Sequence, residues 1–295
     1  MTQNNLGIAY SCLPIGKRGE NLENAIGYYK SALRVRTEKN FPQDWAMTQN
    51  NLGNAYSDLP TGDRGQNLRK AIECFEAALR VRTEGGFPQQ WATTQGNLGN
   101  AYQGLPNGDR GKNLKKAIEC YETALRVYTE EDFPQDWAMT QTNLGAAYRS
   151  LPTGDRGKNL KKAIGCFEAA LRVRTEHGCP QDWAVTQNNL GIAYAKLPTG
   201  DRGKNLVRAI QCYEAALRVR TEQDLPQDWA ATTFNVGLAC LDIYQLTWVA
   251  EAAETALSSF RKAARGFRIV GMVANVRRCN KMARQVEALL RVRDG

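Results

Sequence analysis

The sequence predicts an all-α solenoid of antiparallel helix pairs, and two observations carry this prediction. The first is a tryptophan that recurs every 46 residues, at Trp45, Trp91, Trp137, Trp183 and Trp229. The second is that two segments with the apolar spacing of an amphipathic α-helix follow each tryptophan, separated by Pro and Gly residues. A strict period of about 20–50 residues is typical of solenoids, whose units bury their apolar faces against one another.

In each repeat, a first helix (helix A) starts with the proline before the tryptophan in its first turn, and a second (helix B) follows a loop. In the second copy, Trp45, Leu52 and Tyr56 form one helical stripe, which Leu59-Pro60 ends. Asn67 is the expected N-cap of helix B, which should run into "RVRTE" and end before Phe87-Pro88. We therefore expect units at about 1–40, 41–86, 87–132, 133–178 and 179–224, an eroded unit at 225–265, and a C-terminal capping helix at 266–295.

Composition narrows the class of protein. The chain is 42% hydrophobic and 23% charged, which excludes a disordered protein. It has neither an apolar run of about 18 residues nor an N-terminal signal pattern, so we expect a cytoplasmic protein. Four of the eight cysteines, Cys74, Cys120, Cys166 and Cys212, are one repeat position, which favours small buried residues over disulfides. No closely spaced cysteine pair suggests zinc, and we expect no metal and no cofactor.

The repeat resembles the tetratricopeptide repeat (TPR). The family pattern is met by Leu52-Gly53, Tyr56, Ala71, Phe75 and Ala78, and by their counterparts in the other copies, over residues 1 to about 265. The resemblance implies a right-handed superhelix in which Gly53 and Ala71 let helices A and B approach closely, and whose concave groove binds peptides. This unit is longer than the family's usual unit of about 34 residues, because the A–B loop and the linker between units are both extended.

More narrowly, the unit resembles repeat arrays of bacterial, notably cyanobacterial, multidomain proteins. In such proteins the array often accompanies a caspase-like CHAT protease domain or a signalling NTPase, which are the partners the resemblance implies. Met1 aligns with Met47 in the middle of a helix, so the first unit lacks its "FPQDW" segment and the chain is a candidate fragment.

Helix A contains the positions that differ most between copies. The variable positions, counted in the second copy, are 47, 50, 54, 57 and 58, and helical spacing places them on one face opposite the Trp45–Leu52–Tyr56 stripe. The resemblance assigns this face to the groove. The fixed positions should build the scaffold, while the changing ones contact a partner.

One residue of this face is invariant, at Asn5, Asn51, Asn97, Asn143, Asn189 and Asn235. An amide donates and accepts hydrogen bonds, so such a ladder suits the backbone of an extended ligand. The alternative is that each Asn bonds the neighbouring repeat's backbone and maintains stacking. The predicted partner-binding residues are Asn51, Asn54, Asn97, Asn100, Gln103, Asn143, Arg149, Asn189, Lys196 and Asn235.

Three other features receive structural interpretations. "GDRGKN" before helix B suits an anion but lacks the P-loop pattern, so we expect a turn in which Arg64 pairs locally. His177 and Cys179 lie in a linker, which favours sequence drift over a Cys/His hydrolase. Glu73 and Glu76 are expected to be solvated acids with Arg partners on their own helix.

The tail is the basic part of the chain, with ten Lys/Arg against five Asp/Glu over residues 230–295. Its apolar spacing predicts an amphipathic capping helix with Arg277, Arg278, Lys281 and Arg284 on the wetter side, a candidate basic patch. We predict a non-catalytic scaffold that binds a protein or peptide in its groove, the sensor or docking module of a bacterial signalling or protease system. The alternative is a solenoid that binds nucleic acid or another anion through this patch.

Overall fold

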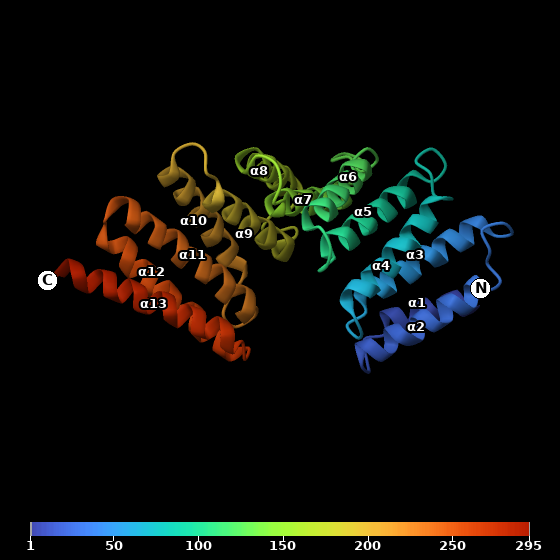
Figure 1. The fold of residues 1–295 in the computed structure, drawn as a ribbon, viewed down its shortest axis with the longest axis horizontal. Helices are drawn as coiled ribbons and strands as arrows, with labels where there is room; N and C mark the ends of the chain where they lie inside the picture. Colours follow the sequence, from blue (N-terminus) through green and yellow to red (C-terminus); the bar gives the residue numbers. More distant parts are fainter. Residues whose placement is uncertain (1, 295) are drawn as a thin grey trace. The chain divides into compact units, whose positions relative to one another are not determined.

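The computed structural model describes residues 2–294, and these form thirteen α-helices with no strand between them (Figure 1). The A helices are α1 (Thr2–Cys12), α3 (Pro42–Asp58), α5 (Pro88–Gly104), α7 (Pro134–Ser150), α9 (Pro180–Lys196) and α11 (Pro226–Thr247). The B helices are α2 (Arg18–Leu33), α4 (Arg64–Leu79), α6 (Arg110–Ala124), α8 (Arg156–Val173), α10 (Arg202–Val219) and α12 (Ala250–Ile269), and α13 (Val273–Asp294) follows. The predicted all-α solenoid of helix pairs is confirmed.

The chain forms two compact units, residues 1–153 with α1–α7 and residues 154–295 with α8–α13. Within each unit, every helix packs against the next one along the chain (Figure 1). The division into repeats, the eroded unit and the cap remains a prediction, although α13 begins at Val273 and packs on α12. No helix among the described residues is long and apolar enough to span a membrane.

Helix A begins and ends where the sequence predicts. Pro occupies the first turn of α3, α5, α7, α9 and α11, where its missing N–H is not needed. Leu59 is the C-cap of α3, in an extended conformation that suits the Pro60 that follows. Gly62 in the next turn has a φ of 76°, and its counterparts Gly108, Gly154 and Gly200 share this left-handed conformation.

The sequence predicts Asn67 as the N-cap of helix B, but in the structure the N-cap is Asp63. The Asp63 carboxylate accepts a 2.6 Å hydrogen bond from the backbone N–H of Gln66, which places the start of α4 at Arg64. Asn67 lies one turn inside the helix, where its side chain donates to the carbonyl of Thr61 at 2.8 Å and fixes the loop. Both residues are good N-cap formers, so residue preference alone does not distinguish them. Helix α4 also stops at Leu79, before "RVRTE".

Helices A and B are held close by a glycine over an aromatic ring. A Cβ built on Gly53 would lie 2.6 Å from Cε1 of Phe75, which is fully buried. Gly7, Gly99, Gly191 and Gly237 contact Tyr29, Tyr121, Tyr213 and Phe260 in the same way. The close approach that the repeat pattern predicted therefore depends on this glycine, while Trp45 packs on Ala77 and Ala78 of helix B.

Arginine and glutamate side chains link neighbouring repeats. Arg80 forms a two-pronged ion pair with Glu38, at 2.9 and 2.8 Å, while its guanidinium lies 5.0 Å from the centre of the Trp45 ring. Arg218 repeats this arrangement with Glu176 and Trp183. Glu76 is exposed, as expected, but its partner lies outside its own helix, because it accepts a 2.9 Å hydrogen bond from the Tyr102 hydroxyl of the next repeat.

Candidate interaction surface

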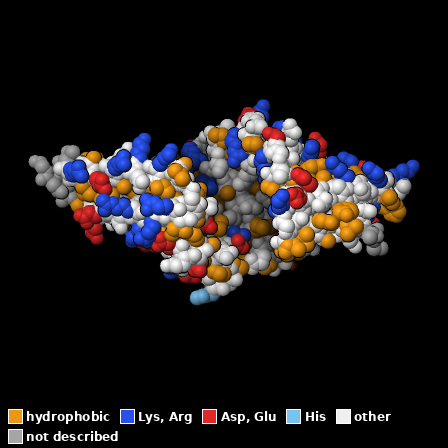
Figure 2. Space-filling view, turned by 90° about the horizontal axis from the view of Figure 1, so that it is seen from below, with side chains coloured by type: hydrophobic (Ala, Val, Ile, Leu, Met, Phe, Trp, Pro, Cys, Tyr) orange, Lys and Arg blue, Asp and Glu red, His pale blue; other side chains and the backbone are white. Residues whose placement is uncertain are grey.

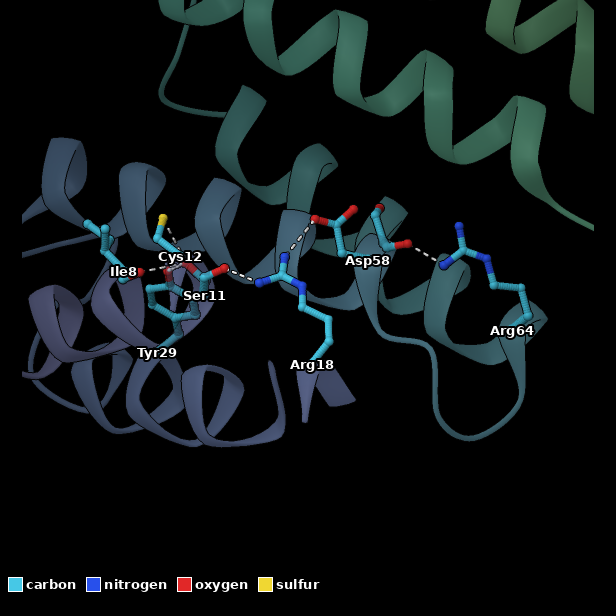
Figure 3. A network of polar contacts seen from close by, with 8 residues as sticks. Ile8, Ser11, Cys12, Arg18, Tyr29, Asp58 and Arg64 are labelled. Atoms are coloured by element: carbon cyan, nitrogen blue, oxygen red, sulfur yellow. Dashed lines mark hydrogen bonds and ion pairs between the residues drawn. The ribbon is translucent and has the colours of Figure 1, made fainter. Parts of the chain in front are cut away.

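The GDRG loop is a structural turn rather than an anion site. The carboxylates of Asp63, Asp109, Asp155 and Asp201 each accept a backbone N–H in the first turn of helix B, the position that an anion would need. Arg64 donates to the carbonyl of Ser57 at the end of helix A, as predicted for a locally paired residue. Figure 3 shows this contact and its counterpart from Arg18 to Ser11, together with the 3.5 Å ion pair between Arg18 and Asp58.

Three of the invariant asparagines bridge adjacent A helices. Asn97 Nδ2 lies 3.4 Å from Asn50 Oδ1, Asn143 Nδ2 lies 3.1 Å from Asn100 Oδ1, and Asn235 Nδ2 lies 3.2 Å from Asn188 Oδ1. The acceptors are side chains at variable positions, not the backbone that the stacking alternative assumed. In each pair the amide nitrogen of the invariant residue holds the neighbouring repeat, which leaves its amide oxygen for another donor.

A polar pocket of about 190 Å³ lies between α3 and α5 in the first unit. It brings together three predicted site residues, Asn54, Asn97 and Asn100. The rest of its wall consists of Ser57, Asp58, Arg64, Leu68, Phe75 and Ala101, none of which was predicted as a site residue. Ser57 and Asp58 stand at variable positions, so variability is the signal that could have found them.

The pocket contains polar groups that the protein leaves without partners. Ser57 Oγ is buried and has no hydrogen-bond partner among the described residues. The exposed side chain of Asn54 forms no hydrogen bond within the same part of the chain. A buried hydroxyl without a partner destabilises the fold by about 1–3 kcal/mol. The pocket thus places an exposed amide beside a buried hydroxyl that has no partner among the described residues.

The aromatic residue of helix B explains why these groups are free. In the first repeat the Tyr29 hydroxyl lies 3.4 Å from Ser11 Oγ (Figure 3), and in the third the Tyr121 hydroxyl lies 2.8 Å from Asn100 Oδ1 and 3.0 Å from Gln103 Oε1. Burial raises the pKa of Tyr121, so its hydroxyl stays a donor at neutral pH. The second repeat has Phe75 at this position, and a phenyl ring gives Ser57 and Asn54 no hydroxyl.

The other predicted residues do not line this pocket. Asn51 is half-buried on α3, and Arg149 is half-buried on α7. In the second unit, Asn189 lies half-buried on α9, and Lys196 lines a separate hollow of about 550 Å³ with Arg202 and Asp242.

The candidate basic patch is split by the fold. Arg277, Lys281 and Arg284 line one hollow of about 480 Å³ on α13, whereas Arg278 lies 4.7 Å from the centre of the Phe234 ring of α11. Packing on an aromatic ring thus separates Arg278 from the other three residues. In Figure 2 many Lys and Arg side chains lie over the C-terminal part of the second unit, on the left of the view.

No catalytic constellation stands out among the described residues. The eight cysteines are free, and burial raises the pKa of Cys74 and Cys120 to about 12, which keeps them protonated and unreactive. His177 is exposed in the linker, and Cys179 is the N-cap residue of α9. The described residues contain no cluster of His, Cys, Asp and Glu that could hold a metal ion.

Two family models and several solved structures of helical-repeat proteins are similar to this chain. A family model of soluble NSF attachment proteins matches residues 39–177, and a Sel1-repeat model matches residues 1–34 and 184–218. The structure of the apo form of RapI is 15% identical, with a TM-score of 0.63, over 100% of this chain and 98% of that chain. No curated protein sequence matches the chain.

Two further solved structures are similar to the chain. A STAND signal-transduction ATPase with a tetratricopeptide repeat sensor, PH0952 from Pyrococcus horikoshii, is 16% identical with a TM-score of 0.56, over 98% of this chain and 42% of that chain. The TPR protein TTC0263 from Thermus thermophilus is 20% identical with a TM-score of 0.49, over 78% and 97% of the two chains. The similarity to RapI and to the ATPase shows that the chain has the fold of helical-repeat proteins. Its helix pairs resemble the tetratricopeptide repeats of that ATPase's sensor.

Proposed function

We propose that this protein is a non-catalytic scaffold that binds an extended segment of a partner protein along the A helices of its first unit. The observation that carries the proposal is the pocket lined by Asn54, Asn97 and Asn100, in which Ser57 Oγ has no partner. Amides and a hydroxyl offer both donors and acceptors, as the backbone and polar side chains of a peptide require.

The geometry of the pocket favours a polar group of the partner at this point. Asn97 uses its Nδ2 on Asn50, and Asn100 uses its Oδ1 on Tyr121 and Asn143, so the opposite ends of the two amides face a ligand. The amide oxygen of Asn97 can accept a hydrogen bond, the amide nitrogen of Asn100 can donate one, and the Ser57 hydroxyl can do either. This combination matches a peptide-type amide or a hydroxyl side chain. Asp58 and Arg64 stand at the edge with opposite charges, so the pocket favours neither sign strongly.

The wider role is that of a sensor or docking module. The likeness to an ATPase whose own repeats are described as a sensor supports this role, as does the resemblance to arrays that accompany signalling NTPases or CHAT proteases. The catalytic partner would then lie on another domain or chain, and the chain itself would act in the cytoplasm of a bacterium.

Selection from a random peptide library displayed on phage tests the proposal. Peptides are selected on the wild-type protein. Their affinity is then measured by calorimetry for the wild type, for the double variant Asn54→Ala/Asn97→Ala and for a matched control, Asn24→Ala, which changes an exposed asparagine of α2. We expect the double variant to lose at least about tenfold in affinity, the equivalent of one or two hydrogen bonds, and the control to lose none. Failure to enrich any peptide, or equal affinity for all three proteins, would contradict the proposal.

A second candidate function is anion or nucleic-acid binding by α13. It is supported by the hollow that Arg277, Lys281 and Arg284 share. Binding of this kind would weaken steeply as salt rises, because it releases counterions. A binding constant for duplex or single-stranded DNA that is unchanged by Lys281→Glu/Arg284→Glu would exclude it.

A further inference from the structure

At three junctions between repeats, a buried arginine clamps the linker to the next helix A. Arg36 donates to Thr48 Oγ1 at 3.1 Å, Arg174 to Thr186 at 3.2 Å and Arg220 to Thr232 at 2.9 Å. All three arginines are at most 8% exposed. Because a buried guanidinium remains charged, it needs a nearby negative group.

At two of these junctions an aspartate of the clamped helix A lies within ion-pair distance of the arginine, and at the third the charge of an aspartate still acts on it. Asp44 lies 3.6 Å from Arg36, and Asp182 lies 3.7 Å from Arg174. Burial lowers the pKa of Arg220 and the charge of Asp228 opposes that effect. The aspartate belongs to the "PQDW" motif at the start of helix A.

The junction between the second and third repeats has the arginine, which is half-buried there, but not the aspartate. Arg82 donates to Thr94 Oγ1 at 2.9 Å, as its counterparts do, but the motif reads "PQQW" and Gln90 replaces the acid. No carboxylate among the described residues lies within ion-pair distance of Arg82. Burial lowers its pKa with no opposing charge.

A cavity of about 230 Å³ lies at this junction, lined by both Arg82 and Gln90. Met47, Val81 and Phe87 give it an apolar wall, and Gln43 and Asp44 complete it. The Asp44 carboxylate is directed to Arg36, its own partner. The cavity therefore combines a guanidinium that lacks a counter-charge with a surface for a short aliphatic group.

We propose that this cavity binds a carboxylate carried on a short apolar chain, with the ligand's carboxylate taking the place of the missing aspartate beside Arg82. Guanidinium and carboxylate form strong charge-assisted hydrogen bonds, and these gain strength where water is partly excluded. The apolar chain lies against Met47, Val81 and Phe87. This site is independent of the pocket between Asn54 and Asn100.

Two sources carry this chemistry, a free organic acid and the C-terminal residue of a peptide. Isovalerate represents the first, and N-acetyl-leucine represents the second. Isovaleramide and N-acetyl-leucinamide have the same shapes without the charge and serve as controls. All four are titrated at constant ionic strength while the backbone amides of Val81, Gln90 and Thr94 are followed by NMR.

We expect saturable shifts at these amides with either acid, with a dissociation constant in the millimolar range that is ordinary for so small a ligand. The amides around Arg36 and Thr48 serve as an internal control and should not move, because that junction contains its own aspartate. Tighter binding of N-acetyl-leucine would identify a chain terminus as the source.

The decisive variant is Gln90→Asp, which restores the motif of the other junctions. It should weaken binding of both acids by at least about tenfold and raise the melting temperature, because the built-in carboxylate now pairs with Arg82. Arg82→Met should also abolish binding, with circular dichroism as a check on folding. Equal shifts from acid and amide, no saturation, or full binding by Gln90→Asp would each overturn the proposal.

Discussion

Phe75 and Tyr121 occupy the same place in consecutive repeats, but only Tyr121 reaches helix A with a hydroxyl, which lies 2.8 Å from Asn100 Oδ1. Both rings pack against the glycine of helix A in the same way. One oxygen atom therefore separates a repeat that satisfies its own polar groups from one that leaves Ser57 Oγ without a partner.

Phe75→Tyr should stabilise the protein. The Gly53 contact already matches that of the tyrosine repeats, so the new hydroxyl should reach Ser57 or Asn54 and contribute about 1 kcal/mol. Urea unfolding measures the effect. In a Ser57→Ala background the gain should shrink, and an equal gain there would show that the hydroxyl acts elsewhere.

Gly53→Ala should destabilise strongly, because its Cβ would lie 2.6 Å from the Phe75 ring. Overpacking of this kind typically reduces the free energy of unfolding by about 1–3 kcal/mol. Gly27→Ala is the matched control, since α2 offers open space around that position and alanine favours a helix by up to about 1 kcal/mol. A neutral Gly53→Ala would show that the helices separate easily.

The first repeat lacks the helix cap that the following four repeats possess. Lys17 stands where Asp63 and Asp109 cap their helices, and it forms no capping hydrogen bond. Lys17→Asp should therefore stabilise α2, and Asp109→Ala should destabilise α6, each by about 1 kcal/mol. Amide hydrogen exchange in the first turns of α2 and α6 distinguishes a local effect from a global one. Faster exchange in α2 after Lys17→Asp would contradict the assignment of residue 17 as the capping position of this helix.

Acid should weaken the ion pairs between repeats. Hydrogen bonds from Arg80, Arg218 and Arg265 lower the pKa values of Glu38, Glu176 and Glu222 from the ordinary 4.5. A lowered folded-state pKa stabilises the protein above the unfolded value, and this contribution is lost as pH falls through the folded value. Changing all three glutamates to Gln should lower the melting temperature at pH 7 and have little effect at pH 3. The same effect at both pH values would assign these residues a role other than charge.

The fold could be predicted from the sequence because the same structural residues recur in each repeat. Trp45, Gly53 and Pro88 recur at fixed spacing, and the packing of the structure uses each of them as expected. The choice between Asp63 and Asn67 as helix cap did not follow, since either side chain can cap a helix and only the loop geometry decides. Likewise Glu76 bonds Tyr102 in the next repeat, a contact that spacing within one helix does not reveal.

The candidate site was predictable in part. The variable face of helix A pointed to Asn54 and Asn100, and the structure brings them together with Asn97 in one pocket. The contribution of Phe75 was missed because the copies carry either Phe or Tyr at this position, and the consequence of the lost hydroxyl appears only when Ser57 is seen beside the ring. Arg278 was grouped with its basic neighbours by charge, whereas Phe234 separates it from them.

The affinity of a library-selected peptide for the wild type and for Phe75→Tyr tests the central claim most directly. If the partner's polar group occupies the pocket between Asn54, Ser57 and Asn97, the tyrosine hydroxyl should displace it and lower affinity at least about tenfold while the protein becomes more stable. Unchanged affinity in a stabilised Phe75→Tyr protein would show that partners bind elsewhere, and the pocket would then be only a packing defect of the second repeat.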